Sequence, residues 1–166
     1  HKRIAFLKGT NNFDSEERYQ AFLQAMSYFR LPVDKEWVLQ GYFEENAAYS
    51  AVRGALSHLS SRPDAIFCAN DEMAVGCLRA LHDMKIAVPD QISVMGFDDG
   101  DAVSRCNPPL TTILNPLSKI ARQSIEELLR LMQPEEEGRM YRIDTQLVVR
   151  ASCTIRFAGK STSTEI

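Results

Sequence analysis

The fold is decided by the stretch Ala65-Ile66-Phe67-Cys68-Ala69-Asn70-Asp71, an apolar run that ends in two polar residues. A short run without polar residues at alternate positions is typical of a parallel strand that is covered on both faces. The residues that follow, as far as about Met84, carry apolar side chains almost all round a predicted helix. A strand followed by a helix is the repeating unit of a parallel α/β sheet.

The same alternation continues on both sides of this stretch. Further strands are expected at 3–7, 37–43 and 92–97, and further helices from about 14 to 31 and from about 48 to 60. Four alternations of strand and helix predict a doubly wound parallel sheet with right-handed crossovers. After residue 100 we expect a short strand at 110–114, a helix at 116–132 with Pro116 at its first position, and closing strands at 143–150 and 153–157.

The composition is that of one ordinary globular domain without an electrostatic grip on nucleic acid. The chain has 166 residues, of which 45% are hydrophobic and 25% charged, and its formal net charge is −3. No basic stripe suits a phosphate backbone or a membrane surface, and no apolar run reaches the roughly 20 residues of a membrane helix. The four cysteines lack the spacing of a zinc site or a redox pair, so we expect reduced thiols of a cytosolic protein.

Polar and aromatic residues gather where the predicted strands end. Arg18 lies on the first turns of the helix after the first strand. Phe43 ends the second strand, and Asn70 and Asp98 follow the third and the fourth. The carboxyl ends of parallel strands share one edge of the sheet, where such folds bind ligands. Asn and Asp can bridge neighbouring hydroxyls, Arg donates from a rigid fork, and an aromatic ring covers the C–H side of a sugar. The pattern predicts a site for a small polyhydroxylated ligand.

Each of these residues also has a purely structural interpretation. Asn70 or Asp71 can cap the helix that follows, and an arginine among glutamates, such as Arg18, can simply face solvent. The sequence Asp98-Asp99-Gly100 can form a plain turn, and Phe43 can belong to the core. Their common location at strand ends favours the ligand site.

The sequence contains no catalytic signature. It has no G-x-S-x-G elbow, no Gly-rich phosphate loop and no G-x-G-x-x-G. His58 and His82 lie in the later turns of predicted helices, away from the strand ends, so no catalytic triad is indicated. The pair Asp98-Asp99 is similar to the acidic pair of a phosphoacceptor receiver, but that pair follows a first strand, which here ends in Lys8-Gly9. We predict no catalytic residue, no metal site and no cofactor.

Several motifs in order resemble the lactose-repressor/galactose-repressor (LacI/GalR) family of bacterial transcription regulators. The motifs are Arg3-Ile4-Ala5-Phe6-Leu7-Lys8-Gly9, Glu17-Arg18-Tyr19-Gln20-Ala21-Phe22, the stretch 65–71, Val88-Pro89-Asp90-Gln91-Ile92-Ser93-Val94-Met95-Gly96-Phe97-Asp98-Asp99, Pro108-Pro109-Leu110-Thr111-Thr112-Ile113 and Leu147-Val148-Val149-Arg150-Ala151-Ser152. The resemblance extends to about Phe157, and its most specific part is the segment from Val88 to Asp99 followed by Pro108 to Ile113.

The resemblance implies a type I periplasmic-binding-protein-like lobe. Residues 1–158 would be the C-terminal portion of an effector-binding and dimerisation domain, with the segment at about 99–118 crossing between lobes. The helix 116–132 would belong to a mostly missing N-terminal lobe, so its apolar face would be uncovered. By the resemblance, the DNA-binding headpiece would be absent and residues 159–166 would be a loose tail, and the start at His1 suggests a piece of a longer protein.

The resemblance also implies residue roles. The effector ligands of the family fall on Arg18, Phe43, Asn70, Asp98 and Asn115. On the helix 71–84, one side carrying Met73, Cys77, Leu78 and Leu81 is expected to form a subunit interface, the alternative being burial between layers.

The implied function is ligand sensing in a cytoplasmic transcriptional regulator. A small effector, a sugar or a related polar metabolite, would allosterically control operator DNA binding by a homodimer, through the missing headpiece. The alternative is the periplasmic sugar-binding protein of a transport system, which shares the fold.

Overall fold

Four parallel strands form the central sheet of the computed structural model, which describes residues 1–58, 61–101, 103, 106–133 and 136–155. The strands are β1 (Ile4–Lys8), β2 (Val38–Gln40), β3 (Ala65–Cys68) and β4 (Ser93–Met95), in the spatial order β2-β1-β3-β4. All three neighbouring pairs are parallel. The predicted doubly wound sheet is therefore confirmed.

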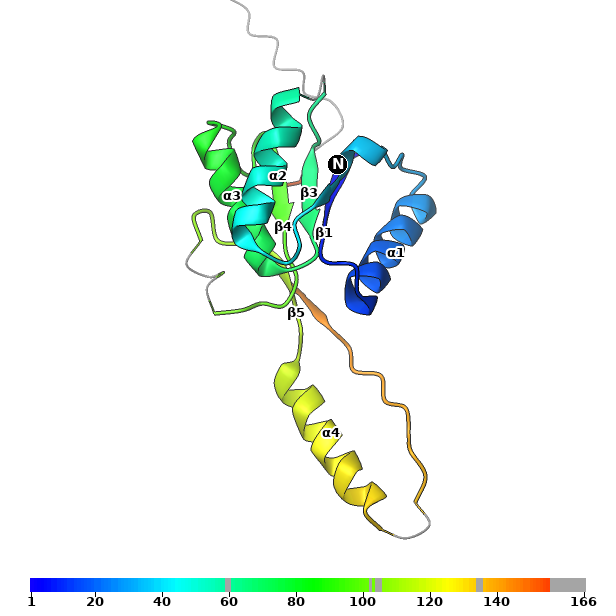
Figure 1. The fold of residues 1–166 in the computed structure, drawn as a ribbon. Helices are drawn as coiled ribbons and strands as arrows, with labels where there is room; N and C mark the ends of the chain where they lie inside the picture. The colour runs from blue at the N-terminus through cyan, green and yellow to red at the C-terminus, as the bar shows by residue number, and fades with distance from the viewer. Residues whose placement is uncertain (59–60, 102, 104–105, 134–135, 156–166) are drawn as a thin grey trace, which may run out of the picture.

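Helices cover both faces of this sheet, as Figure 1 shows. Helix α1 (Phe13–Tyr28) lies on one face, and α2 (Glu45–His58) and α3 (Asp71–Asp83) lie together on the other. The chain moves from β1 outward to β2 and then returns past β1 to β3. Crossovers of one hand place the helices on opposite faces when the direction along the sheet reverses in this way. Ligands of open α/β sheets bind at the point where the strand order reverses, here between β1 and β3.

Local chemistry moves several predicted boundaries. Helix α1 begins one residue before Asp14, because the side chain of Asn12 accepts a hydrogen bond from the Ser15 amide at 2.9 Å and caps the helix. Strand β2 begins only at Val38, because Trp37 ends the one-turn 3₁₀ helix η1 (Lys35–Trp37).

The buried core lies between the sheet and its helices. Phe6 on β1 stacks on Phe22 of α1 at a centroid distance of 4.9 Å, and neither ring is more than 6% exposed. Cys68 and Cys77 are buried among apolar side chains, where they fill space.

The predicted subunit interface on α3 is wrong for the four residues named. Met73, Cys77 and Leu81 have no exposed surface, and Leu78 is 7% exposed. Helix α3 packs against α2 and the sheet, so these side chains belong to the core of the single chain. Met73, Cys77 and Leu81 have no accessible surface with which to contact a second subunit, and Leu78 has little, so the alternative of burial between layers holds.

Beyond β4 the chain leaves the lobe. Strand β5 (Thr112–Leu114) runs outward from the edge of the sheet and pairs antiparallel with the returning β6 (Gln146–Val148). Between them, α4 (Leu117–Leu131) stands away from the lobe (Figure 1). Pro116 precedes the helix as its N-terminal flanking residue and is not its first helical residue.

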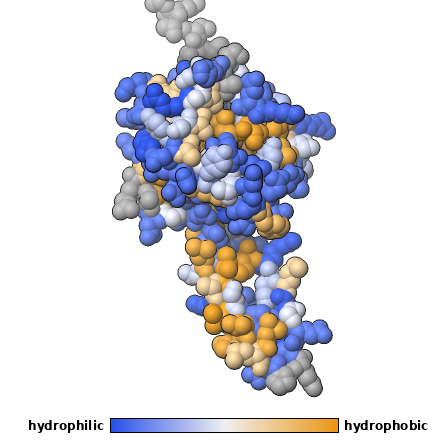
Figure 2. Space-filling model, in the orientation of Figure 1, coloured by the Kyte–Doolittle hydropathy of each residue, from blue (hydrophilic) through white to orange (hydrophobic). Residues whose placement is uncertain are grey.

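Helix α4 presents its apolar side chains to solvent. None of its residues is buried, and Leu117, Ile125, Leu128 and Leu129 are each more than half exposed. Figure 2 shows this as a hydrophobic surface on the part that extends from the lobe. The uncovered face that the resemblance implied is present.

The end of the described chain contains less strand than predicted. Strand β6 covers only three residues of the predicted range 143–150, and residues 153–155 form no strand. Residues 156–157 of the last predicted strand, and the predicted tail 159–166, lie outside the described residues. Among the helices of the described chain, none combines the length and the apolar character needed to cross a bilayer.

Candidate functional site

The site begins with an arginine that reaches from α1 across the carboxyl edge of the sheet. One terminal nitrogen of Arg18 lies 3.7 Å from the Asp98 carboxylate, and the other donates a hydrogen bond to the Ala69 carbonyl. The guanidinium carbon lies 4.1 Å from the centroid of the Phe97 ring, within the range of a cation–π contact. Arg18 is thus held between the ends of β3 and β4, with its side chain only partly exposed to solvent.

Asp98 is held at the switch from β4 to the outgoing strand. Its amide donates to the Ile113 carbonyl at 2.8 Å, and its own carbonyl accepts from the Asn115 amide at 3.2 Å. Burial raises the pKa of the Asp98 carboxyl, whereas the charge of Arg18 and a hydrogen bond from the Asn115 side chain oppose this rise. With its side chain 37% exposed, the carboxylate can still accept hydrogen bonds from a ligand.

An aromatic ring closes the side of the site near β1 and β2. The Arg18 guanidinium lies 5.9 Å from the centroid of the Phe43 ring. Phe43 has a left-handed backbone with φ of 61°, and its ring occupies the space that a Cβ at Gly9 would need. Glycine at position 9 is therefore required for the ring to lie against the end of β1. Phe43 is half-buried and belongs to the rim of the site as well as to the core.

Asn70 has the structural role that the sequence left open. It caps α3, its side-chain oxygen accepting from the Met73 amide at 3.0 Å. A cap of this kind uses the oxygen only, so the amide nitrogen keeps its two donors for another partner. Capping and ligand binding are compatible for this residue.

The structure brings the predicted residues to one edge of the sheet. Arg18 contacts Asp98 and faces Phe43, Asp98 contacts Asn115, and Asn70 directly follows the carbonyl that Arg18 binds. Two members were not predicted. Phe97 could have been found, because it precedes Asp98 at a strand end, but the Ala69 carbonyl is a backbone group that no side-chain pattern reports.

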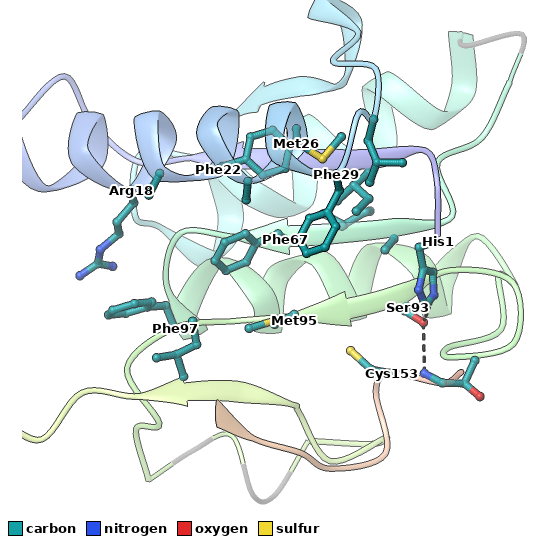
Figure 3. A pocket seen from close by; sticks show the side chains of 18 residues that line it. His1, Arg18, Phe22, Met26, Phe29, Phe67, Ser93, Met95, Phe97 and Cys153 are labelled. Atoms are coloured by element: carbon teal, nitrogen blue, oxygen red, sulfur yellow. Dashed lines mark hydrogen bonds between the residues drawn. The ribbon is translucent and has the colours of Figure 1, made fainter. Parts of the chain in front are cut away.

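A separate cavity of about 600 Å³ lies beside this edge, between α1 and the face of β3 and β4 (Figure 3). Phe67 and Met95 form its floor and Phe22, Met26 and Phe29 come from α1, so its lining is mainly apolar. Arg18 is the one predicted ligand residue among those that line it. The cavity is therefore the part of the sheet face that α1 leaves open, and it is not the polar site.

The described side chains offer nothing for a metal. Within these residues, no group of three or more His, Cys, Asp and Glu side chains is placed to hold an ion. The chemistry of the edge is hydrogen bonding to hydroxyl or carboxylate groups, with a ring for an apolar surface.

Comparison with known proteins begins with the family. Residues 1–153 match the periplasmic binding protein-like domain. The chain is 36% identical over 152 residues to the HTH-type transcriptional repressor PurR of Vibrio parahaemolyticus, covering 90% of this chain and 45% of that protein. It is 32% identical over 154 residues to the probable HTH-type transcriptional repressor ExuR of Bacillus subtilis, covering 92% and 46%. The chain spans about half the length of these curated relatives.

Solved structures give the same result. The Escherichia coli transcriptional repressor ascG aligns with a TM-score of 0.86 and 26% identity, covering 93% of this chain and 56% of that one. A complex of the transcriptional regulator CelR with cellobiose aligns with a TM-score of 0.84 and 28% identity, covering 92% and 47%. These relatives are repressors or regulators by name, in agreement with the prediction that the chain is not an enzyme. The chain belongs to the periplasmic-binding-protein-like domain family, and within it resembles the C-terminal part of the effector-binding domain of LacI-family transcriptional regulators.

Proposed function

We propose that the chain is the sensing lobe of a regulator that binds a small polar effector, a sugar or a related metabolite, at the carboxyl edge of its sheet. The observation that carries the proposal is the partly exposed pair of Arg18 and Asp98, flanked by Phe43 and by the Asn70 amide. The cellobiose bound to one structural neighbour supports a sugar as the class of ligand.

The effector would act between two lobes. We assign α4 to the second lobe, because its apolar face is uncovered here and β5 and β6 form a two-stranded connection out of the first lobe. An effector that contacts both lobes binds the closed arrangement more tightly and so shifts the population toward it. In the full-length homodimer, this shift would change how two headpieces are presented to operator DNA, in a cytoplasmic protein.

Thermal unfolding with a panel of monosaccharides and disaccharides, cellobiose included, tests the proposal. A ligand at about 100 times its Kd adds about 2.7 kcal/mol to the free energy of unfolding. For a domain of this size, that raises Tm by roughly 5 to 10 °C. Asp98→Ala should abolish the shift, because it removes the acceptor for ligand hydroxyls and leaves Arg18 without its carboxylate partner.

Glu17→Gln is the matched control, because Glu17 is an exposed acidic residue next to Arg18 in sequence. This variant should keep the full ligand-induced shift in Tm. An equal shift in Asp98→Ala and in the wild type would refute the site, and a panel without any stabilising sugar would refute the ligand class.

A further inference from the structure

A buried carboxylate outside the ligand set lies directly behind the site. Asp71, the first residue of α3, is only 6% exposed, although aspartate is seldom fully buried. The Asp71 carboxylate fits here because residue 96 is glycine. A Cβ at position 96 would overlap the carboxylate. Burial raises the pKa of Asp71, whereas hydrogen bonds from Thr112 and Gly100 oppose the rise. Such a costly group needs an explanation beyond the capping of α3, which Asn70 already provides.

The Asp71 carboxylate joins two segments that are distant in sequence. One oxygen accepts the Thr112 hydroxyl of β5 at 2.6 Å. The other accepts the Gly100 amide at 3.1 Å, and the Asp99 amide also donates to the carboxylate. Asp71 therefore connects the outgoing strand with Phe97-Asp98-Asp99-Gly100, which we call the ligand loop.

The ligand loop needs such a restraint. Asp98 has φ of 120° and Asp99 has φ of 57°, both in a region that residues other than glycine adopt only when the surroundings hold them there. Arg150 also holds the loop, because it donates to the Asp99 carboxylate at 2.6 Å. On its buried side, the two amides that follow Asp98 are held by Asp71.

We propose that Asp71 is the positioning residue of the site. It holds the ligand loop in its strained backbone conformation and fixes the loop to β5. Asp98 is thereby kept in a fixed position relative to the strand that leads to α4. The proposal rests on the proposed function in one respect, namely that Asp98 binds the ligand. It assigns to Asp71 no contact with the ligand.

Amide hydrogen exchange of the whole chain, measured by NMR without ligand, tests this role. The reporters are the Asp98 amide, which donates to Ile113, and the Asn115 amide, which donates to Asp98, because neither is bonded to Asp71. In Asp71→Ala both should exchange at least about tenfold faster through local opening. The Ala69 amide, bonded to Leu7 in the central sheet, should stay within about twofold of its wild-type rate.

Two variants separate positioning from a general loss of packing. In Asp71→Asn the Asp98 and Asn115 amides should exchange at nearly the wild-type rate. The asparagine side-chain oxygen can accept from the Gly100 amide, while its NH₂ group donates to the Thr112 hydroxyl. Glu72→Gln removes a neighbouring charge from the exposed side of the same helical turn and should change nothing.

Thr112→Val covers the case in which Asp71→Ala does not fold. It removes one of the bonds to Asp71, and exchange at the Asp98 and Asn115 amides should rise about threefold or more. Unchanged exchange at these two amides, or an equal rise at Ala69, would overturn the proposal. Because no ligand is used, the result is independent of whether a sugar binds.

Discussion

At the scale of single residues, Asp64 shows how one carboxylate joins two strands at their amino ends. It accepts hydrogen bonds from the amides of Lys2 and Arg3, both at 3.1 Å, and an ion pair from the Arg3 guanidinium at 2.6 Å. Partial burial would raise the pKa of Asp64, but the hydrogen bonds from Arg3 and Lys2 lower it to about 2. The ionised form is therefore the one that stabilises the start of β1 against β3.

The stabilisation by Asp64 should depend on pH with a definite sign. Because its pKa is lower in the folded than in the unfolded chain, the contribution is complete above about pH 5 and is lost as the pH falls toward 2. Allowing for solvent around Arg3, it amounts to about 1 to 2 kcal/mol. Urea unfolding at pH 7 and pH 3 should show that Asp64→Asn lowers the free energy of unfolding about twice as much at pH 7 as at pH 3. Equal losses at both pH values would contradict this assignment.

At the scale of elements, the contact between α2 and α3 depends on a glycine. A Cβ at Gly76 of α3 would overlap the backbone carbonyl of Glu45 in α2 and lie 3.2 Å from the Cβ of Ala48. The absence of a side chain lets the two helices approach closely. Gly54 on α2 is different, because a Cβ there would meet nothing within 4 Å.

The two glycines predict opposite effects of the same substitution. Gly54→Ala should raise the free energy of unfolding by about 0.5 to 1 kcal/mol, because alanine loses less backbone entropy in a helix. Gly76→Ala should lower it by about 1 to 3 kcal/mol, because α2 and α3 must separate to admit the methyl group. Urea denaturation of both variants measures the difference, and a stabilised Gly76→Ala would show that the helices are not in contact there.

At the scale of the whole molecule, the uncovered face of α4 should drive self-association of the 166-residue chain. Apolar surface contributes about 25 cal/mol per Å² when it is removed from water, and α4 exposes several large side chains in a row. Light scattering at high micromolar concentration should give a mass above 18.7 kDa for the wild type. A double change of Leu128→Ser and Leu129→Ser should restore the monomer mass. A wild type that stays monomeric would show that this face is tolerated in water.

Part of the fold and of the site can be predicted from the sequence, and the rest depends on how the whole molecule packs. Strand and helix alternation predicted the sheet, and strand ends predicted Arg18 and Asp98, because hydrophobic period and chain order are local properties. The interface on α3 was predicted wrongly, because an apolar side chain has the same pattern whether it faces another layer or another subunit. The observed starts of α4 and β2 each lie one residue after the predicted starts. Pro116 flanks α4 at its N-terminus, and Trp37 belongs to a single 3₁₀ turn, so neither residue begins the predicted element.

By itself the sequence determined the order of the elements, the family resemblance and the residue types at the edge of the sheet. Only the tertiary structure decided which atoms meet there: the Ala69 carbonyl on Arg18, the Phe43 ring over Gly9, and the Asp71 carboxylate between Thr112 and Gly100. These contacts join segments about thirty to fifty residues apart. Their formation depends on backbone geometry and on space left by glycines, which no local pattern of side chains encodes.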